Sequence, residues 1–213
     1  MIKIHHLGHS QSERIVWLCE ELAIPYDIVA HARDAVTRLS PPALKALHPL
    51  GAAPVIEDGD LLLAESAAIA EYISVVYADS ALKPGPGSAN YADFLYWFHF
   101  ANGNLQATFM RLMTVSRAGL PPEHPVLLAT QARFGLVLQL VDDRLAAAPY
   151  LAGDALTLAD IMSVFTLTTA RLFNSFDLAP YPHILAYLAR IGARPAYQRA
   201  MAKGDPDLTP MLA

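Results

Sequence analysis

The chain has 213 residues, enough for one large domain or two small ones. Apolar residues make up 54% of the chain and charged residues only 16%, which excludes intrinsic disorder and allows a sizeable core. A formal net charge of −5 argues against nucleic acid or an anionic membrane as a partner.

Cysteine usage and the first residues of the chain indicate the compartment. The single cysteine, Cys19, cannot form an internal disulfide, which fits a reducing environment. Residues 1–8 lack the charged start and apolar block of a signal peptide. The longest uncharged run, 94–110, is interrupted by polar side chains and makes a poor membrane span. We therefore expect a soluble cytoplasmic protein, with part of its apolar excess covering a subunit interface.

The first 78 residues alternate short apolar runs, typical of strands, with stretches of helical periodicity. Strands are predicted at 2–7, 26–29, 54–56 and 61–64. The last two flank Asp58-Gly59, a strong signal for a tight turn between antiparallel strands.

Three helices are predicted among these strands. The first is marked by four apolar residues spaced for one helical face: Ile15, Leu18, Cys19 and Leu22. A second, short helix begins at 40–42 and runs through Leu47. Ser66 can cap the third, whose predicted inner face holds Ile69, Ile73 and Val76 or Tyr77. This order of elements defines a small α/β layer domain.

A linker rich in proline and glycine follows at residues 79–88. After it no strand pattern survives. Helices are predicted at about 89–117, 124–148, 157–173, 183–193 and 196–203. Thr157 and Asp160 have the spacing of a capping box at the start of the third of them. We expect an α/β domain at 1–78, the linker at 79–88 and an all-helical domain at 89–213.

Four short motifs stand in a fixed order along the chain. They are Ser10-Gln11-Ser12-Glu13-Arg14, His48-Pro49-Leu50-Gly51-Ala52-Ala53-Pro54-Val55, Glu65-Ser66 with Ile69 and Tyr72, and Thr157-Leu158-Ala159-Asp160, with Arg194-Pro195 near the end. Together they resemble the glutathione transferase superfamily, in which a thioredoxin-like N-terminal domain precedes a helical bundle. The resemblance covers the whole chain and is greatest to serine-type bacterial and fungal transferases with theta-like N-termini. It implies glutathione as co-substrate and a homodimer.

Ser10 ends the first strand–helix turn, where backbone N–H groups and the helix dipole favour an anion. The resemblance implies that Ser10 is catalytic and stabilises the glutathione thiolate. Ionising a thiol at neutral pH needs a pKa decrease of about 1.5 units, or about 2 kcal/mol, which one hydrogen bond to a charged group can supply. Three alternatives remain open. Ser10 is only a helix cap in register with Glu13, Ser12 faces the thiol instead, or His9 is a second donor.

The resemblance also implies a glutathione-binding set: Ser10, His48, Ala53, Pro54, Glu65 and Ser66. The Ala53–Pro54 peptide bond is expected to be cis, with the Ala53 backbone pairing with the cysteinyl part of glutathione. Glu65 suits the α-ammonium group and Ser66 the γ-glutamyl carboxylate. The alternative for both residues is a helix cap with an acidic first turn.

One position departs from the family pattern. Many relatives carry a basic residue shortly before the cis-proline to hold the glycyl carboxylate, where this chain has Gly51 and Ala52. The candidates to replace it are His48, Arg33 and Arg38. If none of these residues holds the glycyl carboxylate, we expect weak affinity for glutathione or another thiol as the cofactor.

The helix predicted at 89–117 is rich in aromatic residues and methionine. Its default interpretation is bundle core. The resemblance implies instead that one face lines a pocket for the electrophilic substrate, and the expected pocket residues are His99, Asn102, Gly103, Gln106 and Met110.

Other reactive residues are interpreted structurally. Cys19 lies on the apolar helix face, which favours packing over redox chemistry. No metal site is predicted from His5, His6 and His9, because adjacent strand residues face opposite sides and no cysteine or acidic residue stands at ligand spacing.

The resemblance implies a glutathione S-transferase that conjugates the thiolate to a small apolar electrophile, a detoxification reaction. A glutathione-dependent isomerase, dehalogenase or peroxidase shares the same first-half site. A catalytically inactive interaction protein of the same fold is the alternative outside enzymes.

Overall fold

The computed structural model describes residues 1–37 and 39–213, which form two compact units. Unit 1 comprises Met1–Lys83 and Ile191–Pro210, and unit 2 comprises Pro84–Arg190 and Met211–Ala213. The last helix of the chain therefore packs within unit 1, although it follows the helices of unit 2 in sequence.

Unit 1 contains a four-stranded sheet with the strand order β2-β1-β3-β4. Its strands are β1 (Ile2–Leu7), β2 (Tyr26–His31), β3 (Val55–Asp58) and β4 (Leu61–Ala64). β1 pairs in parallel with β2 and antiparallel with β3, and β4 returns antiparallel to β3. The predicted β3–β4 turn is confirmed, with Gly59 in the left-handed conformation that a tight hairpin requires. This topology confirms the expected thioredoxin-like fold class.

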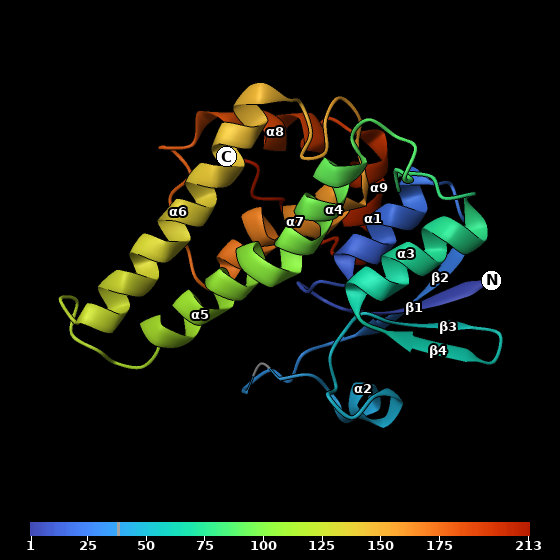
Figure 1. The fold of residues 1–213 in the computed structure, drawn as a ribbon. Coiled ribbons are helices and arrows are strands. Elements are labelled where there is room, and N and C mark those ends of the chain that lie inside the picture. Colours follow the sequence, from blue (N-terminus) through green and yellow to red (C-terminus); the bar gives the residue numbers. More distant parts are fainter. Residues whose placement is uncertain (38) are drawn as a thin grey trace. The chain divides into compact units, whose positions relative to one another are not determined.

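Four helices complete unit 1: α1 (Glu13–Glu21), α2 (Pro42–Leu47), α3 (Ser66–Tyr77) and α9 (Pro195–Gly204). Figure 1 shows α1 and α3 on one side of the sheet and α2 on the other. The predicted apolar face of α1 is confirmed at Ile15, Leu18 and Cys19, which are completely buried. It is wrong at Leu22, which follows the last residue of α1 and is only half-buried. α9 packs along α1, so the covered face of α1 is wider than the four-residue stripe in the sequence.

Ion pairs join α1 to α9 at the edge of this contact. Arg194 donates from two guanidinium nitrogens to the carboxylate of Glu21, at 2.6 and 2.7 Å. Glu20 accepts from Arg199 at 2.7 Å and from the ammonium group of Lys203. These bidentate and clustered pairs fix the position of the chain's last helix on α1.

The predicted inner face of α3 is correct at its start and wrong at its end. Ile69 and Ile73 are completely buried, but Val76 is 55% exposed and Tyr77 is 40% exposed. The hydroxyl of Tyr77 donates to the Asp58 carboxylate on the hairpin, which places its ring at the surface. Ser74 takes the inner position instead, since its hydroxyl donates to the Ala81 carbonyl at 2.6 Å.

Unit 2 is helical, as predicted. Its helices are α4 (Tyr91–Phe100), α5 (Ala107–Ser116), α6 (Pro125–Ala147), α7 (Leu158–Leu167) and α8 (Pro182–Gly192), with a π-helical segment (Ala101–Gln106) between α4 and α5 and a 3₁₀ turn (Thr169–Leu172) after α7. Every residue of α7 is buried, so this helix forms the centre of the unit. None of the helices within the described residues is long and apolar enough to cross a membrane.

The predicted capping box at the start of α7 is confirmed. The Thr157 hydroxyl accepts from the Ala159 N–H at 3.3 Å, and the Asp160 carboxylate accepts from the Thr157 N–H at 2.8 Å. Asp160 also accepts from the Leu151 N–H and the Tyr187 hydroxyl, so this buried carboxylate joins three segments of unit 2.

Candidate functional site

A cavity of about 100 Å³ in unit 1 lies beside the loop that precedes β3. Its lining comprises Gln11, His48, Leu50, Ala52, Ala53, Pro54, Ala64, Glu65 and Ser66. Five of the six residues predicted to bind glutathione are therefore brought together here. The sixth, Ser10, is not in the lining and lies one residue before Gln11.

The cavity includes a cis peptide bond between Ala53 and Pro54, which confirms that expectation. β3 begins directly after it, at Val55. Ala53 is only partly covered, so an extended ligand can reach its backbone N–H and C=O as an added strand would.

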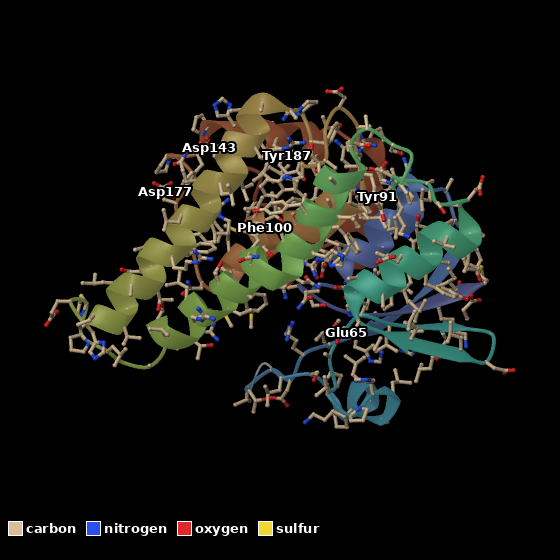
Figure 2. The ribbon with its side chains drawn as sticks, in the orientation of Figure 1. Glu65, Tyr91, Phe100, Asp143, Asp177 and Tyr187 are labelled. Carbon is tan, nitrogen blue, oxygen red and sulfur yellow. The ribbon has the colours of Figure 1, made fainter. Side chains whose placement is uncertain are left out.

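Glu65 and Ser66 form the junction between β4 and α3, where Figure 2 labels Glu65. Glu65 has a φ of 72°, a left-handed conformation that residues other than glycine seldom adopt. Backbone strain of this kind costs about 1–3 kcal/mol and is concentrated at ligand sites. Ser66 is the first helical residue and Glu65 the residue before it, so the expectation that Ser66 caps α3 is wrong.

Arg14 on α1 contacts this junction. The sequence shows it only as part of a motif and predicts no role for it. Its guanidinium is buried and donates to the Ser66 hydroxyl at 3.1 Å and to the Gln11 side-chain oxygen at 2.9 Å. Burial lowers the pKa of Arg14 to about 9. Because Ser66 accepts from Arg14, its own proton can be donated into the cavity. The sequence signal for this supporting role is the position of Arg14, a charged residue directly before the apolar face of α1.

The three candidates for the glycyl carboxylate have different surroundings. His48 lines the cavity. Arg33 instead donates to the backbone carbonyls of Gly8 and His9, at 3.3 and 3.4 Å. Arg38 lies outside the described residues. Among the two described candidates, only His48 belongs to the cavity.

Ser10 and Ser12 differ in how much of their hydroxyl groups remains available. Ser12 is completely buried, and its oxygen lies 2.7 Å from that of Ser10, 2.9 Å from Nδ1 of His6 and accepts from the Leu7 N–H at 3.1 Å. Ser10 is the outer of the two serines, since it is 6% exposed. The geometry therefore favours Ser10 over Ser12 as the residue that faces a ligand.

The interpretation of Ser10 as a capping-box residue is wrong. α1 begins at Glu13 with Ser12 before it, and no side-chain hydrogen bond caps this end. The Ser10 hydroxyl accepts from the Ser12 N–H at 3.3 Å, one residue too early for a capping box with Glu13.

The histidines of β1 face opposite sides of the sheet. His5 contacts His31 at 3.0 Å and Glu57 at 2.8 Å, whereas His6 contacts Ser12. Within residues 1–37 and 39–213, no group of three histidine, cysteine or acidic residues is arranged to hold a metal ion.

Cys19 has the packing role that the sequence favours. It is completely buried in α1, and burial raises the pKa of its thiol to about 12. A thiol that stays protonated at neutral pH is not a nucleophile.

The five residues predicted for the electrophile pocket run along one side of α4, the π-helical segment and α5. They are His99, Asn102, Gly103, Gln106 and Met110, and none of them is buried. Ala101, Leu105 and Phe109 fill the opposite, buried side. The alternative that these five positions form bundle core is therefore wrong. The sequence did not predict the π-helical segment, a feature that often marks functional sites.

Unit 2 also contains a cavity of about 330 Å³ between α5, α6 and the segment 174–181. Its apolar wall includes Leu112, Phe134 and Phe176. None of the five predicted pocket residues lines it.

A thioredoxin-like sheet with a cavity at a cis-proline loop, together with a second, helical unit, defines a class of two-domain proteins. Two family models identify the member of that class. The model "Glutathione S-transferase, N-terminal domain" matches residues 1–75, and "Glutathione S-transferase, C-terminal domain" matches residues 102–195. The chain belongs to the glutathione S-transferase family.

Relatives of known name agree with this assignment. Glutathione S-transferase 3 of Schizosaccharomyces pombe is 30% identical, over 95% of this chain and 88% of its own length. A glutathione S-transferase structure from Actinobacillus pleuropneumoniae has a TM-score of 0.87 at 33% identity, covering 96% of this chain and 93% of that one. A theta class enzyme from Xanthomonas axonopodis pv. citri, solved with glutathione bound, has a TM-score of 0.71 at 30% identity, covering 93% and 96%.

Proposed function

We propose that this glutathione S-transferase binds glutathione in the cavity of unit 1 and transfers its sulfur to a small apolar electrophile. The observation that carries the proposal is the meeting of His48, Ala53, Pro54, Glu65 and Ser66 in one cavity, from three separate segments of the chain. The theta class relative solved with glutathione bound supports the choice of ligand.

The chemistry of the cavity matches the parts of glutathione. Glu65 supplies a carboxylate for the α-ammonium group, and Ser66 with its helix N-terminus supplies donors for the γ-glutamyl carboxylate. The Ala53 backbone pairs with the cysteinyl residue. His48 faces the glycyl carboxylate, which replaces the basic residue absent at Gly51 and Ala52.

Ser10 is the proposed catalytic residue. Its hydroxyl accepts from the Ser12 N–H and lies 2.7 Å from the Ser12 hydroxyl. When Ser12 is the donor of that pair, the Ser10 proton can be donated to the sulfur. A hydrogen bond to the thiolate contributes about 1.5–3 kcal/mol, enough to ionise the thiol near neutral pH.

The electrophile would bind along the uncovered side of α4 to α5, at His99, Asn102, Gly103, Gln106 and Met110. A flexible thioether such as that of Met110 adapts to apolar ligands of different shapes. Catalysis then consists of thiolate stabilisation and of holding the two reactants close together. Because the reaction consumes reduced glutathione, it fits a detoxifying role in the cytoplasm.

The proposal also includes a two-fold homodimer. Apolar side chains on β4 and α3 are exposed: Leu62 by 45%, Val75 by 49% and Val76 by 55%. Exposed apolar groups of this kind mark an association surface. Sedimentation at micromolar concentration tests it, with a dimer expected and a monomer contradicting it.

Replacing Ser10 with alanine tests the proposed chemistry. We expect kcat/KM with glutathione and an aryl halide to fall about 10- to 100-fold, while glutathione affinity measured by calorimetry stays within about threefold. Wild-type turnover in Ser10→Ala would remove Ser10 from the mechanism. No heat of glutathione binding to the wild-type protein would favour a catalytically inactive interaction protein.

A further inference from the structure

The hydroxyl of Ser10 is the outer end of a row of four polar side chains that runs into unit 1. Its oxygen lies 2.7 Å from the Ser12 hydroxyl, which lies 2.9 Å from Nδ1 of His6. The other ring nitrogen of His6, Nε2, lies 3.4 Å from the Asp205 carboxylate. The row thus joins the turn before α1, the strand β1 and the residue that ends α9.

The inner members of this row are excluded from water. Ser12 is 0% exposed, His6 is 1% exposed and Asp205 is 5% exposed. Gly204 makes room for the ring, because a Cβ there would lie 3.2 Å from the His6 imidazole. A larger residue at the end of α9 would therefore push His6 away from its partners.

Asp205 remains a charged partner for His6 despite its burial. Burial by itself would raise the pKa of Asp205, but attraction to His6 and a 2.8 Å hydrogen bond from the His9 N–H hold it below its usual range. Nε2 of His6 and Oδ2 of Asp205 have no hydrogen-bond partner in the described part of the chain, and they face each other. A positive charge on the ring would strengthen this long contact.

We propose that His6 receives the glutathione thiol proton through Ser12 and Ser10. The inference rests on the proposed function, since it places the sulfur against Ser10. The thiol gives its proton to the Ser10 oxygen, Ser10 gives its own to Ser12, and Ser12 gives its own to Nδ1 of His6. A thiolate and an imidazolium result, and the imidazolium pairs with Asp205. Three protons each move by one position, and no other bond changes.

The hydrogen-bonding capacity of both serines is respected before and after the transfer. In the resting state Ser12 donates to His6 and accepts from Ser10 and the Leu7 N–H. Afterwards it donates to Ser10 and accepts from His6 and the same N–H. Its contact with the Leu7 carbonyl is longer, at 3.3 Å. Ser10 accepts from the Ser12 N–H in both states and ends by donating to the thiolate.

The transfer needs help from its surroundings. Moving a proton from a thiol of pKa about 8.5 to a histidine of pKa about 6.5 is unfavourable by about 100-fold. The Asp205 charge and the Ser10–thiolate hydrogen bond act against this cost. One other titratable group lies beside the pair: His9, whose Nε2 is 3.9 Å from Asp205. His31 lies on the other side of the sheet against His5, and burial and the nearby charges of His5 and His6 lower its pKa. His6 does not touch glutathione, so it is a positioning residue and Ser10 alone is catalytic.

Nitrogen NMR of the histidines in the wild-type protein tests the proposal without a mutation. At about one pH unit above the ordinary histidine pKa of about 6.5, adding glutathione should move both His6 nitrogen signals to imidazolium values. S-methylglutathione, which has no thiol proton, should leave them unchanged. Ultraviolet absorbance reports the thiolate in the same sample. A neutral His6 with bound glutathione, whether thiol or thiolate, would overturn the relay. Failure of glutathione to bind would overturn the proposed function itself.

Two variants measure the size of the effect. In His6→Asn and Asp205→Asn the pH at which bound glutathione is half ionised should rise by about one unit, a tenfold change in the ionisation constant. The affinity for S-methylglutathione should not change, which shows that the site is intact. His5→Asn is the matched control on the same strand, because His5 contacts His31 and Glu57 instead of the row. Equal midpoints in all the proteins would contradict the relay.

Discussion

The cavity of unit 1 and the uncovered side of α4 to α5 in unit 2 are built in different ways. The cavity combines the backbone of Ala53, the strained carboxylate residue Glu65 and the supported hydroxyl of Ser66. The side of α4 to α5 is a series of positions at helical spacing without Asp, Glu, Lys or Arg: His99, Asn102, Gly103, Gln106 and Met110. A ligand of constant structure requires particular groups at particular points. A variable apolar ligand requires only an adaptable surface, so it leaves a weaker signal in the sequence.

Replacing Arg14 is expected to have the largest effect, because it should damage the cavity of unit 1 and leave the side of α4 to α5 unchanged. Replacing it with methionine leaves the side-chain oxygens of the buried Ser66 and the half-buried Gln11 without this donor, so stability should fall by about 3 kcal/mol and glutathione affinity should fall with it. Arg14→Lys should restore only part of both, because an ammonium group lacks the guanidinium fork. Denaturant unfolding and calorimetry measure the two quantities. Unchanged glutathione affinity in Arg14→Met would show that Arg14 does not organise the cavity.

Glu65 tests whether charge recognition defines the cavity. Glu65→Gln should weaken glutathione binding about tenfold through loss of a charge-assisted hydrogen bond, with little change in kcat at saturation. Asp60→Asn is the matched control, because it removes an exposed carboxylate from the hairpin of the same unit. Equal affinities of the two variants, measured by calorimetry, would refute the assignment of Glu65 to the α-ammonium group.

Acid should weaken unit 1 through Glu20. Burial by itself would raise the pKa of Glu20, but it is lowered to about 2 by three donors: Lys203, Tyr26 and Arg199. Its ion pairs therefore stabilise the protein fully above about pH 4.5 and are lost as the pH falls toward 2. Glu20→Gln should lower the free energy of unfolding at neutral pH by about 1–2 kcal/mol, a discounted value because its basic partners are half exposed.

The prediction for Glu20 is checked by the free energy of unfolding measured as the pH is lowered. Denaturant unfolding at a series of pH values should show a shallower loss of stability in Glu20→Gln than in the wild-type protein. Glu71→Gln, which breaks the more exposed pair with Lys83, is the control and should change stability by less than about 0.5 kcal/mol. Identical acid limbs for all three proteins would rule out the Glu20 pairs as the cause.

The smallest effect is expected at the uncovered side of unit 2. Met110→Ala should raise KM for an apolar electrophile about threefold and leave glutathione affinity unchanged, because Met110 is 43% exposed and contributes only apolar contact. Leu136→Ala, an exposed truncation on α6, should change neither. A loss of glutathione affinity in Met110→Ala would break the distinction between the two regions.

Local patterns predicted most of the fold and the outline of the cavity. Period-2 and period-3.6 spacing, the Asp58-Gly59 turn and the Thr157 capping box depend on neighbouring residues, so they could be seen in the sequence. The prediction for the end of the inner face of α3 was wrong, and at Tyr77 the reason is a hydrogen bond to Asp58 on the hairpin, which the local pattern does not reveal.

Two of the missed features depend on contacts between distant segments. Arg14 gains its role from Ser66, and His6 gains its role from Asp205 at the other end of the chain. No spacing rule links such positions. The π-helical segment depends on one extra residue per turn, which ordinary helical periodicity does not reveal.

A crystal structure of the protein with bound glutathione tests the central claim most directly. The account predicts the γ-glutamyl end at Glu65 and Ser66, the cysteinyl residue along the Ala53 backbone and the sulfur within hydrogen-bond distance of the Ser10 hydroxyl. A cavity that stays empty at saturating glutathione, or a sulfur turned away from Ser10, would contradict it.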